Sequence, residues 1–163
     1  MDSDTSIFIE AFHLITSLNN NLFEIIFISL KVSLTAVLLS CLISIPLATL
    51  ISIKDFFGKN TLMVVINALM GLPPVVVGLF IYLLLSYQGP LSAYNLLYTE
   101  SAMIIAQFVI VTPIIIALSK QTMDIIYAEY KDFIASLRLS TIKAITLLIY
   151  DTRHLLIVTG LAG

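Results

Sequence analysis

Charged side chains are scarce in this chain. Only 11% of its 163 residues are charged, whereas 60% are hydrophobic. A soluble domain carries roughly 25% charged residues, because its whole surface faces water. So few charges cannot cover such a surface, but they can cover the ends of helices whose sides face lipid. The composition therefore predicts an all-α, polytopic membrane protein surrounded by membrane lipid, and we expect no nucleic-acid partner.

Residues suited to metal binding or catalysis are also few. Cys41 is the single cysteine, which excludes an internal disulfide and a cysteine-based metal site within the chain. His13 and His154 are far apart in the sequence, and polar residues at the membrane interface are the simpler interpretation. The sequence contains no evident nucleophile–base pattern, paired carboxylates or phosphate-binding loop. We therefore expect a protein that is not an enzyme, with no catalytic residue, metal or cofactor.

Basic residues are absent from the N-terminal part as well, where the first is Lys31. Four acidic residues precede it: Asp2, Asp4, Glu10 and Glu24. A secretory signal begins with a basic region before a short apolar core. The N-terminus is therefore not a signal, and we interpret residues 1–26 as an extracytoplasmic segment.

What the chain has in plenty is long apolar runs. A helix needs about 20 apolar residues to cross a bilayer core. We predict a transmembrane domain over 27–163, with spans at about 27–53, 62–85 and 102–118. A fourth apolar run starts at 155 and stops at Gly163, which is too short to cross. We therefore expect a C-terminally incomplete chain that ends within a span.

Two adjacent prolines interrupt the second run, in the sequence Gly71-Leu72-Pro73-Pro74. Proline lacks the backbone N–H and disfavours the α conformation of the residue before it. We expect the helix to be kinked or unwound here, exposing backbone donors that suit an anion. Because the spans lack arginine and Lys31 is peripheral, a dianion would meet amides and hydroxyls rather than a fixed countercharge.

The distribution of lysine and arginine predicts the orientation. Lys54 and Lys59 lie in the first loop. The long polar segment 120–153 contains five more basic residues: Lys120, Lys131, Arg138, Lys143 and Arg153. Segment 86–100 and the N-terminal tail contain none. Spans alternate in direction, so both basic loops fall on one side, which the positive-inside rule assigns to the cytoplasm, with the N-terminus outside.

The polar segment 120–153 contains two predicted helices. In the first, about 129–137, apolar side chains recur at helical spacing: Tyr130, Phe133, Ile134 and Leu137. Ser140 can cap a second helix at about 141–150. Such a hairpin suits either the lipid surface or a protein partner, because both require the same amphipathicity.

This segment resembles the cytoplasmic loop of ABC importer permeases, where Glu-Ala-Ala is followed by a glycine and an apolar segment. The matching stretch is 132–140, in which Asp132 stands for the glutamate, and Leu137 and Ser140 fit the pattern. The departures are Phe133 and Ile134 for the two alanines and Arg138 for the glycine. Glycine adopts a positive φ freely, whereas arginine does so at a cost. Either the turn differs in this chain, or its coupling is altered.

Four stretches of the spans are similar to a narrower family, the oxyanion permeases, and most of all to their tungstate branch. They are Gly71-Leu72-Pro73-Pro74-Val75-Val76-Val77-Gly78-Leu79, Gly89-Pro90-Leu91, Ala102-Met103-Ile104-Ile105-Ala106-Gln107 and Thr112-Pro113-Ile114. The resemblance covers about residue 29 to the end. It implies a MetI-like ABC permease fold that continues beyond Gly163 with further spans.

The resemblance also implies a function and partners. The chain would be the permease subunit of an ATP-driven importer in a bacterial or archaeal cell membrane, carrying a tetrahedral oxyanion, most of all tungstate, into the cytoplasm. Its partners would be a second permease copy in a homodimer, cytoplasmic ATPase subunits that hydrolyse the ATP, and an extracytoplasmic solute-binding protein. A permease for molybdate or sulfate, or a truncated fragment that does not transport, remain the alternatives.

Two sets of residues follow from this resemblance. Six would line the substrate path: Leu72, Pro73, Pro74, Gly78, Gln107 and Thr112. Eight would couple the chain to the ATPase: Tyr130, Asp132, Phe133, Ile134, Ser136, Leu137, Arg138 and Ser140. The alternative roles are structural. Gly71 and Gly78 would then allow close helix packing, and Gln107 and Thr112 would join helices by hydrogen bonds.

Overall fold

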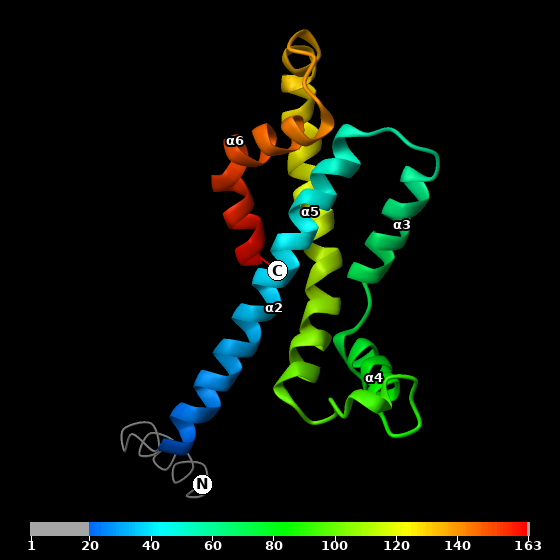
Figure 1. The fold of residues 1–163 in the computed structure, drawn as a ribbon, viewed down its shortest axis with the longest axis vertical. Coiled ribbons are helices and arrows are strands. Elements are labelled where there is room, and N and C mark those ends of the chain that lie inside the picture. The colour runs from blue at the N-terminus through cyan, green and yellow to red at the C-terminus, as the bar shows by residue number, and fades with distance from the viewer. Residues whose placement is uncertain (1–19, 163) are drawn as a thin grey trace, which may run out of the picture.

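The computed structural model describes residues 20–162, which form helices and connecting turns without a strand (Figure 1). The elements are α2 (Asn20–Ile53), α3 (Lys59–Met70), α4 (Pro74–Leu85), the 3₁₀ helix η1 (Ser92–Tyr94), α5 (Glu100–Ser136) and α6 (Thr141–Ala162). The predicted all-α class is confirmed. Most of the predicted N-terminal segment 1–26, His13 included, lies outside the described residues.

Two helices, α2 and α5, are each long and apolar enough to cross a membrane. With 34 and 37 residues, they are about 51 and 55 Å long at a rise of 1.5 Å per residue. The hydrocarbon core of a bilayer is about 30 Å thick. Pro46 lies inside α2 and Pro113 inside α5, and both helices continue past them. Each helix therefore extends beyond the hydrocarbon core.

α2 and α5 run side by side in the same direction (Figure 1). Three serine hydroxyls of α2 donate to backbone oxygens of α5: Ser40 to Phe108 at 3.5 Å, Ser44 to Thr112 at 3.3 Å and Ser52 to Lys120 at 3.4 Å. The two residues of each pair are 68 positions apart. The helices therefore keep one parallel register along this stretch, which we call the α2–α5 seam.

Small side chains explain the close packing of the seam. Every fourth residue of α2 over this stretch is alanine or serine, and all are buried: Ala36, Ser40, Ser44, Ala48 and Ser52. Residues four apart lie on one face of a helix, and small residues there let two backbones approach closely in lipid. None of the expectations above includes this seam, although the four-residue spacing is present in the sequence.

The second apolar run is broken, as its two prolines predict. α3 ends at Met70, α4 begins at Pro74, and the two are bent by 97°. The N–H of Gly71 donates to the carbonyls of Asn67 and Ala68, which closes the last turn of α3. Pro74 takes the first position of α4, where a backbone N–H would have no helical partner. The pair is either one broken span or a re-entrant loop.

Segment 120–153 differs from its expected form. α5 runs from Glu100 to Ser136 without interruption, so the third apolar run and the predicted helix 129–137 are one helix. α6 likewise joins the predicted helix 141–150 to the apolar run that starts at 155. No glycine or proline lies between 114 and 159. A helix without such a residue satisfies its own backbone and can continue past the end of an apolar run, as α5 and α6 do on either side of the turn at 137–140.

The loops that carry basic residues lie at one end of the molecule. Figure 1 shows the α2–α3 loop and the α5–α6 turn together near the top, and the α4–α5 connection near the opposite end, where α2 begins. This arrangement agrees with the alternation from which the orientation is predicted. The side of the membrane on which each end lies stays a prediction.

Candidate functional site

The break between α3 and α4 borders an apolar recess of about 360 Å³. Leu72, Val76 and Phe80 line it from the broken run, and Val109 and Ile110 line it from α5. α4 turns away from α3 at this point, so α5 alone cannot fill the space between them. Of the predicted path residues, Leu72 therefore faces a real opening, with apolar walls.

The break offers fewer backbone donors than expected. Pro73 and Pro74 have no N–H. The N–H groups of Val76 and Val77 both donate to the carbonyl oxygen of Pro73, at 2.9 and 3.4 Å. The prolines that break the helix thus remove two donors, and the first turn of α4 uses two more. An anion in this recess would meet hydrocarbon rather than a row of amides, which corrects the expectation drawn from the broken helix.

Gly78 lies one turn into α4 and lines a second recess, of about 240 Å³, with Tyr82, Tyr98 and Ala106. A hydrogen bond with Tyr82 raises the pKa of Tyr98 above its ordinary value. A Cβ atom added at Gly78 would meet nothing within 4 Å, and one added at Gly71 would meet only the backbone of α3. Within residues 20–162, neither glycine is needed for close helix packing.

Gln107 and Thr112 lie on the side of α5 that faces α2. The Nε2 of Gln107 donates to the hydroxyl of Ser33 at 3.3 Å, and its Oε1 is buried without a partner among the described residues. The hydroxyl of Thr112 donates to the Phe108 carbonyl at 2.6 Å, and its oxygen lies 3.3 Å from that of the Ser40 hydroxyl. The structure thus separates these two residues from Leu72, Pro73 and Pro74, and it gives Thr112 the contacts of an interhelical tie.

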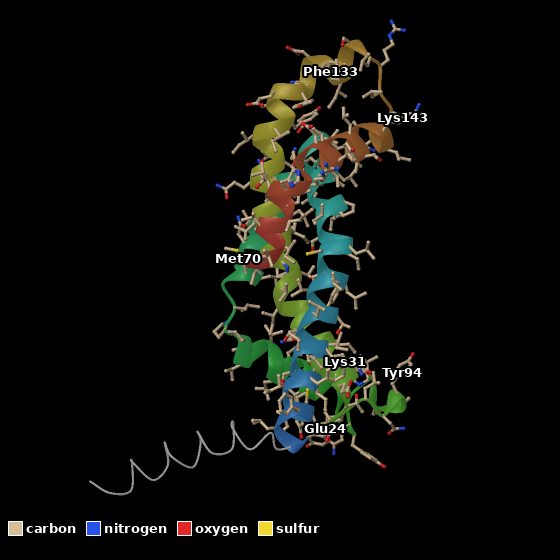
Figure 2. All side chains as sticks on the ribbon, turned by 90° about the vertical axis from the view of Figure 1, so that its left-hand side faces the viewer. Glu24, Lys31, Met70, Tyr94, Phe133 and Lys143 are labelled. Atoms are coloured by element: carbon tan, nitrogen blue, oxygen red, sulfur yellow. The ribbon has the colours of Figure 1, made fainter. Side chains whose placement is uncertain are left out.

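The end of α5 and the start of α6 form a hairpin that protrudes beyond the other helices (Figure 2). Inside it, Ile134 is buried in a cluster with Met123 and Leu148, and Tyr130 packs against that cluster. Phe133 and Leu137 point elsewhere and remain about half exposed, at 51% and 53%. The expected apolar stripe therefore divides into an inner half that holds the hairpin together and an outer half that is open to a partner.

Arg138 adopts the conformation that a glycine would have. Its φ is +47°, in the left-handed region. Its N–H donates to the Ala135 carbonyl at 3.1 Å, and the N–H of Leu139 donates to the Ile134 carbonyl at 3.3 Å. These two bonds form the Schellman pattern, which glycine usually completes. The turn of this chain thus has the geometry that a glycine favours, and arginine adopts it at a cost of about 1–2 kcal/mol.

The remaining predicted coupling residues lie on the surface of the hairpin. Asp132, Ser136 and Ser140 are exposed. The hydroxyl of Tyr130 donates to the carboxylate of Asp151 at 2.5 Å and so ties α5 to α6. The eight predicted residues therefore form one continuous structure, in which Tyr130 and Ile134 support the tip and the others form its outer surface.

Two long apolar helices, a broken third run and a protruding polar hairpin define a polytopic α-helical membrane protein. Comparison with curated proteins gives the more particular finding. The chain is 37% identical over 105 residues to a probable anion ABC transporter permease protein of Haloferax volcanii. It is 40% identical over 109 residues to the tungstate uptake system permease protein TupB of Peptoclostridium acidaminophilum, and 34% identical over 103 residues to TupB of Campylobacter jejuni.

These similarities cover 63–67% of this chain but only 43–48% of each relative, so the chain spans about half the length of the curated relatives it matches. No family model and no solved structure matches it. Over about two thirds of its length, the chain is thus similar to permease subunits of anion ABC transporters, and the resemblance inferred from its motifs is confirmed.

Proposed function

We propose that this chain is a membrane-spanning permease subunit of an ATP-driven importer for a tetrahedral oxyanion, with tungstate as the first candidate. The observation that carries the proposal is its 34–40% identity to three permeases whose names state anion or tungstate transport. The two spanning helices and the broken third run support it. Molybdate and sulfate are also tetrahedral dianions, so charge and shape leave them as competing substrates.

The partners follow from the same proposal. ATP hydrolysis belongs to separate cytoplasmic ATPase subunits, an extracytoplasmic solute-binding protein delivers the anion, and a second permease copy completes the path as a homodimer. The end with the basic loops then faces the cytoplasm, and the N-terminus lies outside. Tungstate uptake by cells that carry the complete system tests the proposal, with a hydrolysis-deficient ATPase as control. Uptake that persists without this chain, or that ATP hydrolysis does not affect, would contradict it.

The hairpin tip is the element that docks onto the ATPase in this proposal. Phe133 and Leu137 present apolar side chains at the protruding end, as an amphipathic helix does when it enters a groove. Cross-linking to the ATPase from Asp132→Cys and Ser136→Cys, in a Cys41→Ser background, tests this docking. Tyr94→Cys is the matched control, because Tyr94 is exposed at the opposite end of the molecule (Figure 2). Cross-links from neither tip position, or equally from Tyr94→Cys, would favour a hairpin that lies on lipid.

A further inference from the structure

A polar recess of about 290 Å³ lies between α3 and α5. Four polar side chains line it: Asn67, Lys120, Gln121 and Asp124. Met70 lines both this recess and the apolar recess at the helix break. The two recesses therefore adjoin at the end of α3, and an anion that passes the break would reach this polar group next.

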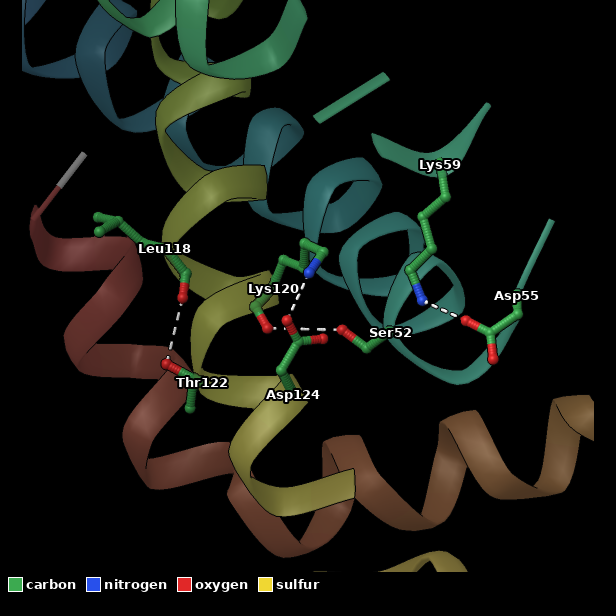
Figure 3. A network of polar contacts seen from close by, with 7 residues as sticks. All are labelled: Ser52, Asp55, Lys59, Leu118, Lys120, Thr122 and Asp124. Carbon is green, nitrogen blue, oxygen red and sulfur yellow. Dashed lines mark hydrogen bonds and ion pairs between the residues drawn. The ribbon is translucent and has the colours of Figure 1, made fainter. Parts of the chain in front are cut away.

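Lys120 is more deeply buried than its counter-ion. Its side chain is 16% exposed, whereas that of Asp124, with which it forms an ion pair one turn along α5, is 44% exposed (Figure 3). The hydroxyl of Ser52 donates to the backbone oxygen of Lys120 at 3.4 Å, which anchors this turn of α5 to α2. Asp124 is therefore the more solvent-accessible partner of this ion pair.

The position of Lys120 along α5 suits an exit. Lys120 follows Glu100, the first residue of α5, by about 30 Å of helix, which matches the thickness of a bilayer hydrocarbon core. If Glu100 lies at one interface, Lys120 lies at the other, beside Ser52 in the last turn of α2. An anion leaving the apolar recess at the break would meet its first fixed positive charge here.

We infer that this recess binds a tetrahedral oxyanion through the Lys120 ammonium and the side-chain amides of Asn67 and Gln121, with Asp124 as a displaceable counter-ion. Bonds from a charged donor are the stronger ones, and neutral amides complete the contacts of an oxyanion. Competition from Asp124 keeps the affinity low enough for release, which a conducting path requires. The inference rests on the proposed function and names a step on its path. A phospholipid phosphate has the same chemistry, so the test must separate the two sources.

The test measures how fast an anionic thiosulfonate reagent labels Ala117→Cys, a position that lines the recess, in a Cys41→Ser background. The assembled permease is labelled with and without tungstate, in phosphate-free maltoside micelles and in phosphatidylcholine nanodiscs. Tungstate should slow the labelling, and Lys120→Gln should raise the half-protecting tungstate concentration about tenfold or more. Asp124→Asn should lower that concentration, because the competing carboxylate is gone.

Lys59→Gln is the matched control. Lys59 pairs with Asp55, which is also four residues away in the sequence and near the same end of the molecule, but neither residue lines the recess (Figure 3). Tungstate protection in both environments identifies a free oxyanion. Nanodiscs that protect without tungstate, in a manner that Lys120→Gln abolishes, identify a lipid phosphate on the same donors. Labelling that neither tungstate nor lipid slows, or protection that Lys120→Gln leaves unchanged, overturns the inference.

Tungstate uptake by the unmodified system is measured in parallel, so that the two proposals fail separately. Uptake without protection of Ala117→Cys removes this inference and leaves the proposed function. Protection without uptake removes the proposed function and leaves an oxyanion site.

Discussion

The two faces of α5 differ in how closely neighbouring helices pack against them. Along the α2–α5 seam, the face toward α2 is filled: alanines and serines repeat every fourth residue on α2, and serine hydroxyls donate to α5 carbonyls in constant register. Nearer the first residues of both helices, α2 and α5 border a recess of about 520 Å³ beside Ser33 and Gln107. The face toward α3 and α4 is hollowed by a series of recesses. Two of them lie beside α4, which turns away from α3 by 97°, and the polar one lies between α3 and α5. In lipid, no hydrophobic effect drives helices together, because their apolar side chains are not in water. Close packing and interhelical hydrogen bonds hold them together instead. The seam is thus the rigid support, and the hollowed face carries the proposed path.

The largest expected difference between the two faces comes from the same truncation made on each. Ile115→Ala removes a fully buried side chain on the seam face and should destabilise the protein by about 2–4 kcal/mol through a new cavity. Ile110→Ala, beside the recess at the break, should cost less than about 1 kcal/mol, because part of that side chain already lacks packing partners. Unfolding of the purified protein in detergent measures both. Equal losses would mean that the faces do not differ in packing.

Overpacking the seam should have the next largest effect. Ser44→Leu places a large side chain where two backbones meet and should cost about 1–3 kcal/mol. Ser44→Ala is the control, since it removes the hydroxyl bond to Thr112 but keeps the size, and such bonds average about 0.6 kcal/mol in membrane proteins. A Ser44→Leu protein as stable as Ser44→Ala would show that the helices are not held closely by small residues.

At Gly78, unlike on the seam, we expect a large side chain to lower transport and to leave stability unchanged. The free space beside its Cα should accept leucine without loss of stability. If the recess is part of the path, Gly78→Leu should lower tungstate uptake about tenfold, which corresponds to about 1.4 kcal/mol, and Gly78→Ala should lower it far less. Uptake is compared at equal amounts of assembled protein. Normal uptake in Gly78→Leu would exclude this recess from the path.

The smallest effect is expected at the turn of the hairpin, away from both faces. Arg138→Gly should stabilise the α5–α6 turn by about 1 kcal/mol, because the residue already has a left-handed conformation. Arg138→Ala, which keeps the strain and loses the charge, separates conformation from electrostatics. Denaturant unfolding of both variants measures the difference. If glycine and alanine at this position give the same stability, the left-handed turn is not the cause.

Local chemistry made several features predictable. The break follows from Pro73 and Pro74, whose missing N–H groups no tertiary contact restores, and the two long spans follow from apolar runs. The amphipathic spacing of Tyr130, Phe133, Ile134 and Leu137 was a poorer guide. Periodicity marks a face of a helix, but the packing of α6 divided that face into a buried and an exposed half.

The positions of the candidate path residues also could not be predicted from local sequence patterns. Gln107 and Thr112 read as polar residues in a span, yet only the parallel register of α2 and α5 places them on the side away from the broken helix. Lys120 reads as one basic residue of a polar loop, and only the continuation of α5 and its packing beside α3 place it on the same recess as Asn67. Such assignments depend on contacts between residues far apart in the chain.

The sequence by itself determined that this is a helical membrane protein, where its second span breaks, and which of its segments resemble oxyanion permeases. Hydrophobic length, proline geometry and short motifs are properties of neighbouring residues, so they can be read in order along the chain. Only the packing of the helices showed where α5 is filled, along the α2–α5 seam, where it is hollow, and that Arg138 takes the glycine conformation. These features depend on contacts between helices that are distant in the sequence. The sizes and hydrogen-bonding groups of the side chains at those contacts determine how closely the helices pack.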